Sequence, residues 1–168
     1  MIKVKVVDLI FDEISQMGIV LLEEETALKQ EQQNPKVLPI WIGVFEAQSI
    51  LFKLQNLFFP RPLTHDLLKN VIEIMSGKVE YVVITKIKDN TFYAEIHILK
   101  GEDKVVVDSR PSDAISLAIR VDCPIYVTEE VMLQAGVDKE EFLKEQKSKV
   151  LEQLLKFVDT EDENKLKH

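Results

Sequence analysis

Apolar and polar residues alternate with a period of two along several short segments, the pattern of strands that bury one face. The alternation is clear in residues 2–11 and 91–100. Turn residues separate the second segment from apolar runs at residues 79–88 and 105–108, which predicts a three-stranded antiparallel meander. Further short apolar runs predict strands at residues 17–23, 37–42 and 124–127.

Other segments repeat their apolar residues at helical spacing. Helices are predicted from Gly43 to about residue 54, at 113–121, at 128–135, and from Thr64, as N-cap, to Ser76. The predicted buried face of the helix after Thr64 comprises Leu67, Leu68, Val71, Ile72 and Met75. The sequence therefore predicts an α+β fold, with a mixed or mostly antiparallel sheet flanked by helices.

The last part of the chain reads as a separate unit. Asp138 and Glu141 form a capping-box pattern before a long amphipathic helix, predicted to reach about Val158. Its apolar stripe comprises Val150, Leu151, Leu154, Leu155 and Val158. We therefore divide the chain into a domain at residues 1–135 and a C-terminal helix with a charged tail at residues 136–168. The stripe can dock on the domain or pair with another copy, and we predict a homodimer.

Composition narrows the function classes. The 168 residues suit one domain, and the net charge of −8 argues against tight binding of duplex nucleic acid, which usually needs a basic face. A nuclease whose metal neutralises the phosphate can still be acidic. Apolar runs are interrupted by charge, so no membrane span is expected. The single cysteine, Cys123, excludes an intrachain disulfide and fits the cytoplasm, the predicted location.

Arginine is used sparingly: the chain has 21 basic residues, of which three are arginine, Arg61, Arg110 and Arg120. Two of them lie in similar segments, Arg61-Pro62-Leu63-Thr64-His65-Asp66 and Asp108-Ser109-Arg110-Pro111-Ser112-Asp113. A guanidinium group holds phosphate or carboxylate with two hydrogen bonds, which lysine cannot do. Each arginine can therefore bind phosphate, or it can pair with an acid and hold the start of a helix.

Candidate catalytic side chains occur at predicted strand ends and helix starts, where ligand sites often form and backbone N–H groups favour anions. These residues are Glu46, His65, Asp66, Asp108 and Asp113. Carboxylates with one histidine can hold Mg²⁺ or Mn²⁺ against a phosphate, while Arg61 or Arg110 clamps the oxygens. The structural alternative is that Asp66 and Asp113 stabilise helix N-termini.

Four motifs together resemble the bifunctional nuclease domain family over about residues 1–135. They are Leu38-Pro39-Ile40-Trp41-Ile42-Gly43 with Glu46-Ala47, the Arg61–Asp66 segment, Thr91-Phe92-Tyr93-Ala94, and the Asp108–Asp113 segment extended to Ala114-Ile115. The resemblance implies an α+β domain with DNase and RNase activity. It singles out Glu46, Arg61, His65, Asp66, Asp108, Arg110, Ser112 and Asp113.

Two hypotheses follow. In the first, the chain is a metal-assisted nuclease that binds nucleic acid weakly. Its catalytic residues are His65, Asp66, Asp113 and Glu46, its phosphate-binding residues Arg61, Arg110 and Ser112, and its Mg²⁺ or Mn²⁺ ligands Asp66, Asp108 and Asp113. This hypothesis predicts that these groups converge around an open cleft. In the second, the chain is a non-enzymatic anion-binding, regulatory or oligomer-forming module, with paired Arg–Asp contacts and an exposed apolar patch.

Overall fold

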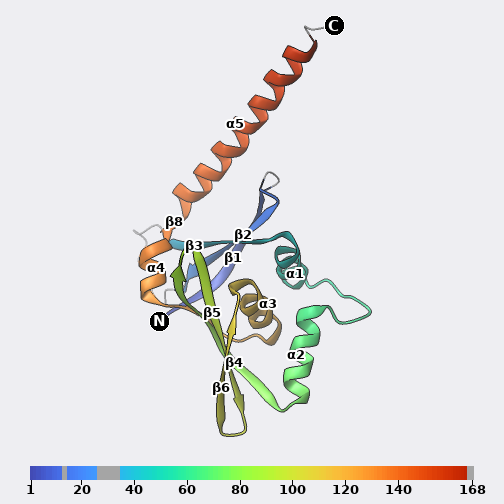
Figure 1. Ribbon diagram of the computed structural model, residues 1–168, viewed down its shortest axis with the longest axis vertical. Coiled ribbons are helices and arrows are strands. Elements are labelled where there is room, and N and C mark those ends of the chain that lie inside the picture. The colour runs from blue at the N-terminus through green and yellow to red at the C-terminus, as the bar shows by residue number, and fades with distance from the viewer. Residues whose placement is uncertain (13–14, 26–34, 166–168) are drawn as a thin grey trace.

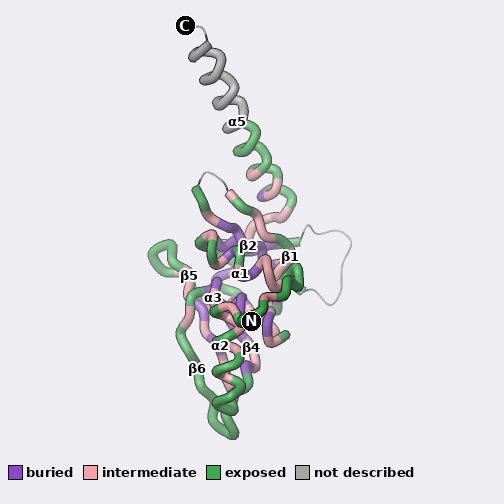
Figure 2. The backbone as a smooth tube through the Cα atoms, turned by 90° about the vertical axis from the view of Figure 1, so that its right-hand side faces the viewer, coloured by how far each residue is buried: buried purple, intermediate pink, exposed green. Residues whose placement is uncertain are grey.

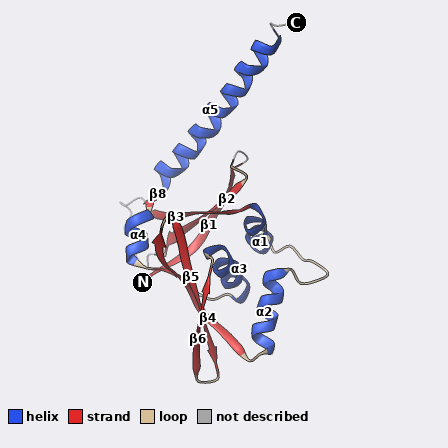
Figure 3. Cartoon of the chain, viewed as in Figure 1, coloured by secondary structure: helices blue, strands red, loops and turns tan. Residues whose placement is uncertain are grey.

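The predicted α+β fold is confirmed: in the computed structural model, one mixed sheet carries helices, and a long C-terminal helix extends from it (Figure 1). The backbone is described for residues 1–12, 15–25 and 35–165, and side chains in these ranges up to Glu152. Figure 3 shows the same elements coloured by type. In chain order the elements are β1 (Ile2–Asp12), β2 (Met17–Glu24), β3 (Lys36–Gly43), α1 (Val44–Leu54), α2 (Thr64–Ile74), β4 (Gly77–Lys88), β5 (Thr91–Lys100), β6 (Asp103–Ser109), α3 (Pro111–Val121), β7 (Ile125–Val127), α4 (Glu129–Ala135), β8 (Val137–Asp138) and α5 (Lys139–Lys165).

The sheet joins two antiparallel meanders through a short strand. Among the described residues its strand order is β6-β5-β4-β7-β1-β2-β3-β8. Strand β7 pairs antiparallel with β1 and parallel with β4, so it connects the β1-β2-β3 meander to the β4-β5-β6 meander. Each meander is followed by a helix, α1 or α3, and these two helices pack against each other. This arrangement brings the starts of two distant helices to one side of the sheet.

Strand β2 is buried on both faces. Val20 and Leu22 belong to the main core with Ile50 of α1, whereas Ile19 and Leu21 form a second cluster with Phe142 of α5. A Cβ atom at Gly18 would clash with the Cβ of Ala47, so glycine is needed where α1 crosses β2. The close approach of α1 therefore explains why a glycine stands at this position of β2.

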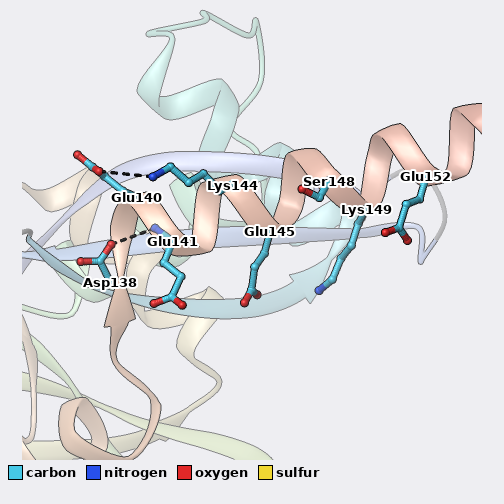
Figure 4. Close-up of a pocket in the computed structure, with 8 residues that line it drawn as sticks. All are labelled: Asp138, Glu140, Glu141, Lys144, Glu145, Ser148, Lys149 and Glu152. Atoms are coloured by element: carbon cyan, nitrogen blue, oxygen red, sulfur yellow. Dashed lines mark hydrogen bonds and ion pairs between the residues drawn. The ribbon is translucent and has the colours of Figure 1, made fainter.

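The start of α5 contacts the domain. The Asp138 carboxylate accepts a hydrogen bond from the backbone N–H of Glu141 at 3.0 Å, as the capping-box pattern predicted (Figure 4). Strand β8 pairs with β3, and Phe142 is 6% exposed. Farther along the stripe Val150 and Leu151 are exposed, while Leu154, Leu155 and Val158 lie outside the described side chains. No described helix has the length and apolar run that crossing a bilayer requires.

Helix α2 differs from its prediction in what it buries. None of its residues is buried, and Leu67, Val71 and Met75 of the predicted buried face are exposed. Figure 2 shows α2 largely in the colour of exposed residues. The helix contacts α3 and β4, with Ile72 partly buried against the core. Apolar periodicity marks a face that avoids water, but it does not show whether the same chain covers that face.

Candidate functional site

The first turns of α1, α2 and α3 meet on the helix-bearing side of the sheet. Glu46 lies in the first turn of α1 and Asp113 in the first turn of α3, where acids favour the helix dipole. Helix α3 begins with Pro111 directly after β6, so Arg110 becomes its N-cap. His65 is the second residue of α2. These positions bring side chains from distant parts of the chain within hydrogen-bonding reach.

Arg110 links two carboxylates at this meeting point. Its Nε and Nη2 atoms donate to Oδ2 and Oδ1 of Asp113 at 2.7 and 3.0 Å, a bidentate pair. Its Nη1 atom donates to Glu46 Oε1 at 2.9 Å. The Arg110 side chain is 64% exposed, against 22% for Glu46. A guanidinium group held this way presents a positive charge to solvent while its carboxylate partners are half-buried.

Asp113 also contacts His65, and its surroundings favour the ionised carboxylate. The His65 Nε2 atom lies 3.0 Å from Asp113 Oδ1. Burial alone would raise the pKa of Asp113, but hydrogen bonds from Arg110 and His65 outweigh it and hold this pKa below its ordinary value. The hydrogen bonds from Arg110 to Asp113 and Glu46 raise the pKa of the guanidinium in turn. Asp113 is therefore a fixed negative charge behind His65.

A second arginine lies beneath the first network. Arg120, whose side chain is 2% exposed, donates from Nε to Asp66 Oδ1 at 2.7 Å and from Nη1 to the Ser116 carbonyl at 2.9 Å. Its Nη2 atom donates to the carbonyl and hydroxyl oxygens of Ser49 at 3.1 and 3.2 Å. Asp66 Oδ2 accepts from the Leu63 backbone N–H at 3.1 Å. Arg120 and Asp66 therefore connect the three helices.

These contacts define the tautomer of the neutral His65 ring. The Ser49 hydroxyl oxygen lies 2.9 Å from His65 Nδ1. Arginine can only donate, so Ser49 Oγ accepts from Arg120 and its own hydrogen is available to Nδ1. In the neutral imidazole, Nδ1 then accepts and Nε2 carries the proton toward Asp113, a tautomer assigned from the hydrogen-bond network. Ser49, His65 and Asp113 thus form a continuous relay.

An open pocket of about 560 Å³ exposes this relay to solvent. Its polar wall includes Glu46, Ser49, His65, Arg110 and Asp113. Its apolar wall comprises Phe45, Phe52, Pro62 and Leu63. The pocket has volume for a small anionic ligand and offers it one cation beside an apolar surface.

The structure brings together four of the predicted site residues, Glu46, His65, Arg110 and Asp113. The other four do not line this pocket. Asp66 pairs with Arg120, Ser112 is 4% exposed in α3, and Arg61 is exposed in the loop before α2.

Asp108 lies on the other face of the sheet. It pairs with Glu95 in the β5–β6 register, whereas the neighbouring pair is Ile96 with Val107. Ile96 faces the core shared with α3, and directly paired residues share a face, so Asp108 points away from α3.

Sequence reasoning missed three contributors to this region. Ser49 lies three residues after Glu46, so helical spacing places both on the same side of α1, which could have revealed it. Arg120 was noted as one of three arginines but was not assigned to the site. Its partners come from α1 and α2, which are distant in the sequence. Phe45 is 78% exposed at the pocket, which an apolar residue in a helix does not signal by itself.

The predicted metal ligands are not arranged as a cation site. Among the described residues, no group of three or more His, Cys, Asp or Glu side chains is placed to hold a metal ion. At the pocket the Arg110 guanidinium lies between Glu46 and Asp113, where a shared cation would otherwise bridge them. The residues present therefore do not fit the predicted three-carboxylate set in this conformation.

A larger hollow of about 780 Å³ lies along the start of α5 (Figure 4). Its lining consists of side chains from one helix and the residue before it, and includes Glu140, Lys144, Glu145 and Glu152. Glu140 and Lys144 pair at 4.0 Å with both side chains well exposed. This is a solvated charged surface, so the candidate site remains the pocket between the three helix starts.

Comparisons with known proteins show which family the chain is similar to. The model of a family described as the bifunctional nuclease domain matches residues 26–140. The chain is 40% identical over 110 residues to an uncharacterized protein of Mycobacterium tuberculosis, covering 66% of this chain and 65% of the relative. It is 30% identical over 113 residues to bifunctional nuclease 1 of Oryza sativa subsp. indica, and 29% over 113 residues to bifunctional nuclease 2 of Arabidopsis thaliana. Both matches cover 66% of this chain, but 34% of each plant protein.

Proposed function

Since the chain belongs to the bifunctional nuclease domain family, we propose that it hydrolyses phosphodiester bonds in nucleic acid at the pocket between α1, α2 and α3. One observation carries the proposal: Glu46, His65, Arg110 and Asp113, from three separate segments, converge on a single open pocket. Convergence of acid, base and cation around a cleft is what phosphoryl chemistry needs.

Arg110 is the phosphate-binding residue in this proposal. Its exposed guanidinium can turn a donor from Glu46 to a phosphate oxygen while the bidentate pair with Asp113 keeps it in place. Glu46, once released, is the general base that takes a proton from the attacking water. His65 in its protonated form supplies the proton to the leaving oxygen, and Asp113 stabilises that imidazolium.

The pocket favours a single strand over a duplex. Phe45 and Phe52 line the pocket together with the charged groups, and Phe45 is largely exposed. An unpaired base can stack on such a ring while its phosphate reaches Arg110, whereas a base inside a duplex cannot. The net charge of −8 agrees with weak, local binding.

Dependence on Mg²⁺ or Mn²⁺ stays a prediction, and we assign no step to a cation. A divalent ion at Glu46 and Asp113 would have to displace the guanidinium that now joins them. Titrating the cleavage assay with EDTA, followed by either metal, tests this prediction directly. Loss of cleavage in EDTA and its return with one metal would support a metal-assisted reaction.

The central experiment measures cleavage of end-labelled single-stranded RNA and DNA by purified wild type, Glu46→Gln and His65→Ala. We expect at least a 100-fold loss of rate in both variants, about the contribution of a positioned acid or base. The matched controls are Glu95→Gln and His97→Ala, because these residues form another histidine–glutamate pair, at 3.2 Å, that does not line the pocket. Equal cleavage by all five proteins would reveal a contaminant, and no cleavage by wild type would refute the proposal.

The second candidate function is a non-enzymatic module that binds an anion. It is favoured by the observation that Arg110 pairs with two carboxylates, as the paired contacts of that hypothesis require. Fluorescence anisotropy with the same oligonucleotides separates the two candidates. Binding that Arg110→Met abolishes, without cleavage by wild type under any metal condition, would favour the module.

A further inference from the structure

The sheet has a long free edge at β6. Among the described residues the strand order runs from β6 at one edge to β8 at the other. The outer N–H and C=O groups of an edge strand have no ladder partner in their own sheet, so they can pair with another chain. Strand β8 has two residues and leads into α5, whereas β6 has seven. Strand β6 is therefore the edge better suited to the addition of a further strand.

Strand β6 lacks the features that usually protect an edge. Proteins protect edge strands with proline, with bulges or with charges that interrupt the apolar run. The β6 sequence contains no proline or glycine, and it pairs with β5 in one unbroken register. Its three central residues, Val105, Val106 and Val107, are consecutive and are 42%, 52% and 41% exposed. Figure 2 shows β6 mainly in the colour of exposed residues. An exposed, regular and valine-rich edge is suited to strand addition.

The sequence of β6 is complementary to itself. Consider two copies that pair β6 with β6 in antiparallel fashion, across a two-fold axis that passes beside Val106. Lys104 of each copy then lies directly opposite Asp108 of the other, and Val105 lies opposite Val107. Directly opposite residues share a face of the sheet, and opposite charges in such a pair are stabilising. This pairing therefore places two Lys–Asp pairs on either side of an apolar centre.

The charges also select one register. A two-fold axis beside Val105 would place Lys104 opposite Val106, and an axis beside Val107 would place Asp108 opposite Val106. A shift by a single residue between these strands is excluded, because it would place the apolar residues of the two copies on opposite faces. Of the three registers centred on a valine, the one centred on Val106 pairs both charges.

Lys104 and Asp108 have no ion-pair partner within the part of the chain that the structure describes. On β5, Lys104 lies opposite Leu99, and Asp108 lies opposite Glu95, which carries the same charge. Lys104 and Asp108 of one chain are four residues apart along a strand, about 13 Å, which exceeds the screening length of about 8–10 Å in salt. A second copy would supply the opposite charge that each of these residues lacks.

We propose that β6 is the interface of a homodimer, in which two copies pair their β6 strands with Val106 at the two-fold axis. The pairing joins two eight-stranded sheets into one, and the same strand serves both copies, as an isologous interface requires. Main-chain hydrogen bonds supply the affinity, and the two Lys–Asp pairs fix the register. The match of Lys104 with Asp108 favours a second copy over a strand of another protein.

Sedimentation equilibrium measures the mass of wild type, Lys104→Glu and Asp108→Lys against the 19.4 kDa of one chain. We expect wild type at twice this mass at about 100 μM, a concentration at which even a weak strand pairing is populated. Each substitution places like charges opposite each other at both Lys–Asp pairs, so we expect a dimer at least about 10-fold weaker. Both residues are exposed, so each variant should stay folded, which circular dichroism checks.

The decisive variant is the double substitution Lys104→Glu/Asp108→Lys. It restores opposite charges across the axis and leaves the net charge at −8, so it should dimerise like wild type. An equimolar mixture of the two single variants should also form dimers, because each variant supplies the charge that the other lacks. The matched control is Lys88→Glu, an exposed lysine of β4 whose reversal changes the net charge by the same amount. This control should remain a dimer.

A monomeric wild type at about 100 μM would overturn the proposal and would leave the β6 edge to a strand of another protein. Dimers that survive both single substitutions, or that weaken equally in Lys88→Glu, would overturn it too. A double variant that stays monomeric would refute the register. The proposal does not depend on catalysis, so a failed cleavage assay would leave it standing, and a monomer would leave the proposed function standing.

Discussion

Two arginines at opposite ends of α3 should respond very differently to the same substitution. Arg120→Met removes a guanidinium that is 2% exposed and donates to Asp66, to Ser49 and to the Ser116 carbonyl. Arg110→Met removes one that is 64% exposed and pairs with Glu46 and Asp113. Methionine keeps most of the apolar stem in both cases, so the comparison isolates the charged group.

The expected losses of stability follow from burial. Breaking a buried ion pair costs about 3–5 kcal/mol, and we take about 3 kcal/mol for Arg120 because Asp66 is 38% exposed and can be solvated. An exposed pair is worth about 0–1 kcal/mol, which is the range for Arg110. At this chain length 1 kcal/mol shifts the Tm by about 2–4 °C, so Arg120→Met should melt about 10 °C lower.

Urea unfolding of wild type and both variants at one protein concentration measures these free energies, and the concentration is held fixed because dimerisation would shift them. Arg110→Met should unfold close to wild type but lose oligonucleotide cleavage or binding. If Arg110→Met lost as much stability as Arg120→Met, the division between a structural and a functional arginine would be wrong.

Two further predictions concern a charge and a glycine. The pKa of Asp113 is lowered in the folded state. Its contribution to the free energy of unfolding is therefore present above the ordinary aspartate pKa of about 4 and is lost as pH falls through the folded-state pKa. The free energy of unfolding of Asp113→Asn should therefore fall below that of wild type at pH 7, by about 1 kcal/mol, and the gap should close below about pH 4 in acid titrations. Gly18→Ala should cost about 1–3 kcal/mol in urea unfolding, because its Cβ would meet Ala47, whereas Gly101→Asn, at a turn with open space and φ of 62°, should cost under 1 kcal/mol. Equal losses at the two glycines would contradict the close approach of α1.

Local patterns were enough to predict most elements. The meander of β4, β5 and β6 follows from alternation and turn residues, and α3 follows from Pro111 with its apolar period. The capping hydrogen bond of Asp138 to the Glu141 backbone N–H was also correctly predicted, because capping involves groups three residues apart. The face of α2 was not, since its exposure depends on whether a distant segment covers it.

The residue types at the candidate site were visible in the sequence, but their partners were not. Two similar Arg-Pro segments pointed to His65, Asp66, Arg110 and Asp113. In the structure Asp66 pairs with the buried Arg120, whereas His65 and Arg110 both contact Asp113 at the open pocket.

The sequence by itself determined the α+β class, the family and the chemical groups available, because these depend on composition and local spacing. Only the tertiary structure decided that Arg110, 64 residues after Glu46, joins that carboxylate to Asp113, that Arg120 holds Asp66, and that Asp108 faces away from α3. The physical reason is that ion pairs and burial are set by which helix starts meet over the sheet, and contacts between distant segments leave no periodic pattern in the chain.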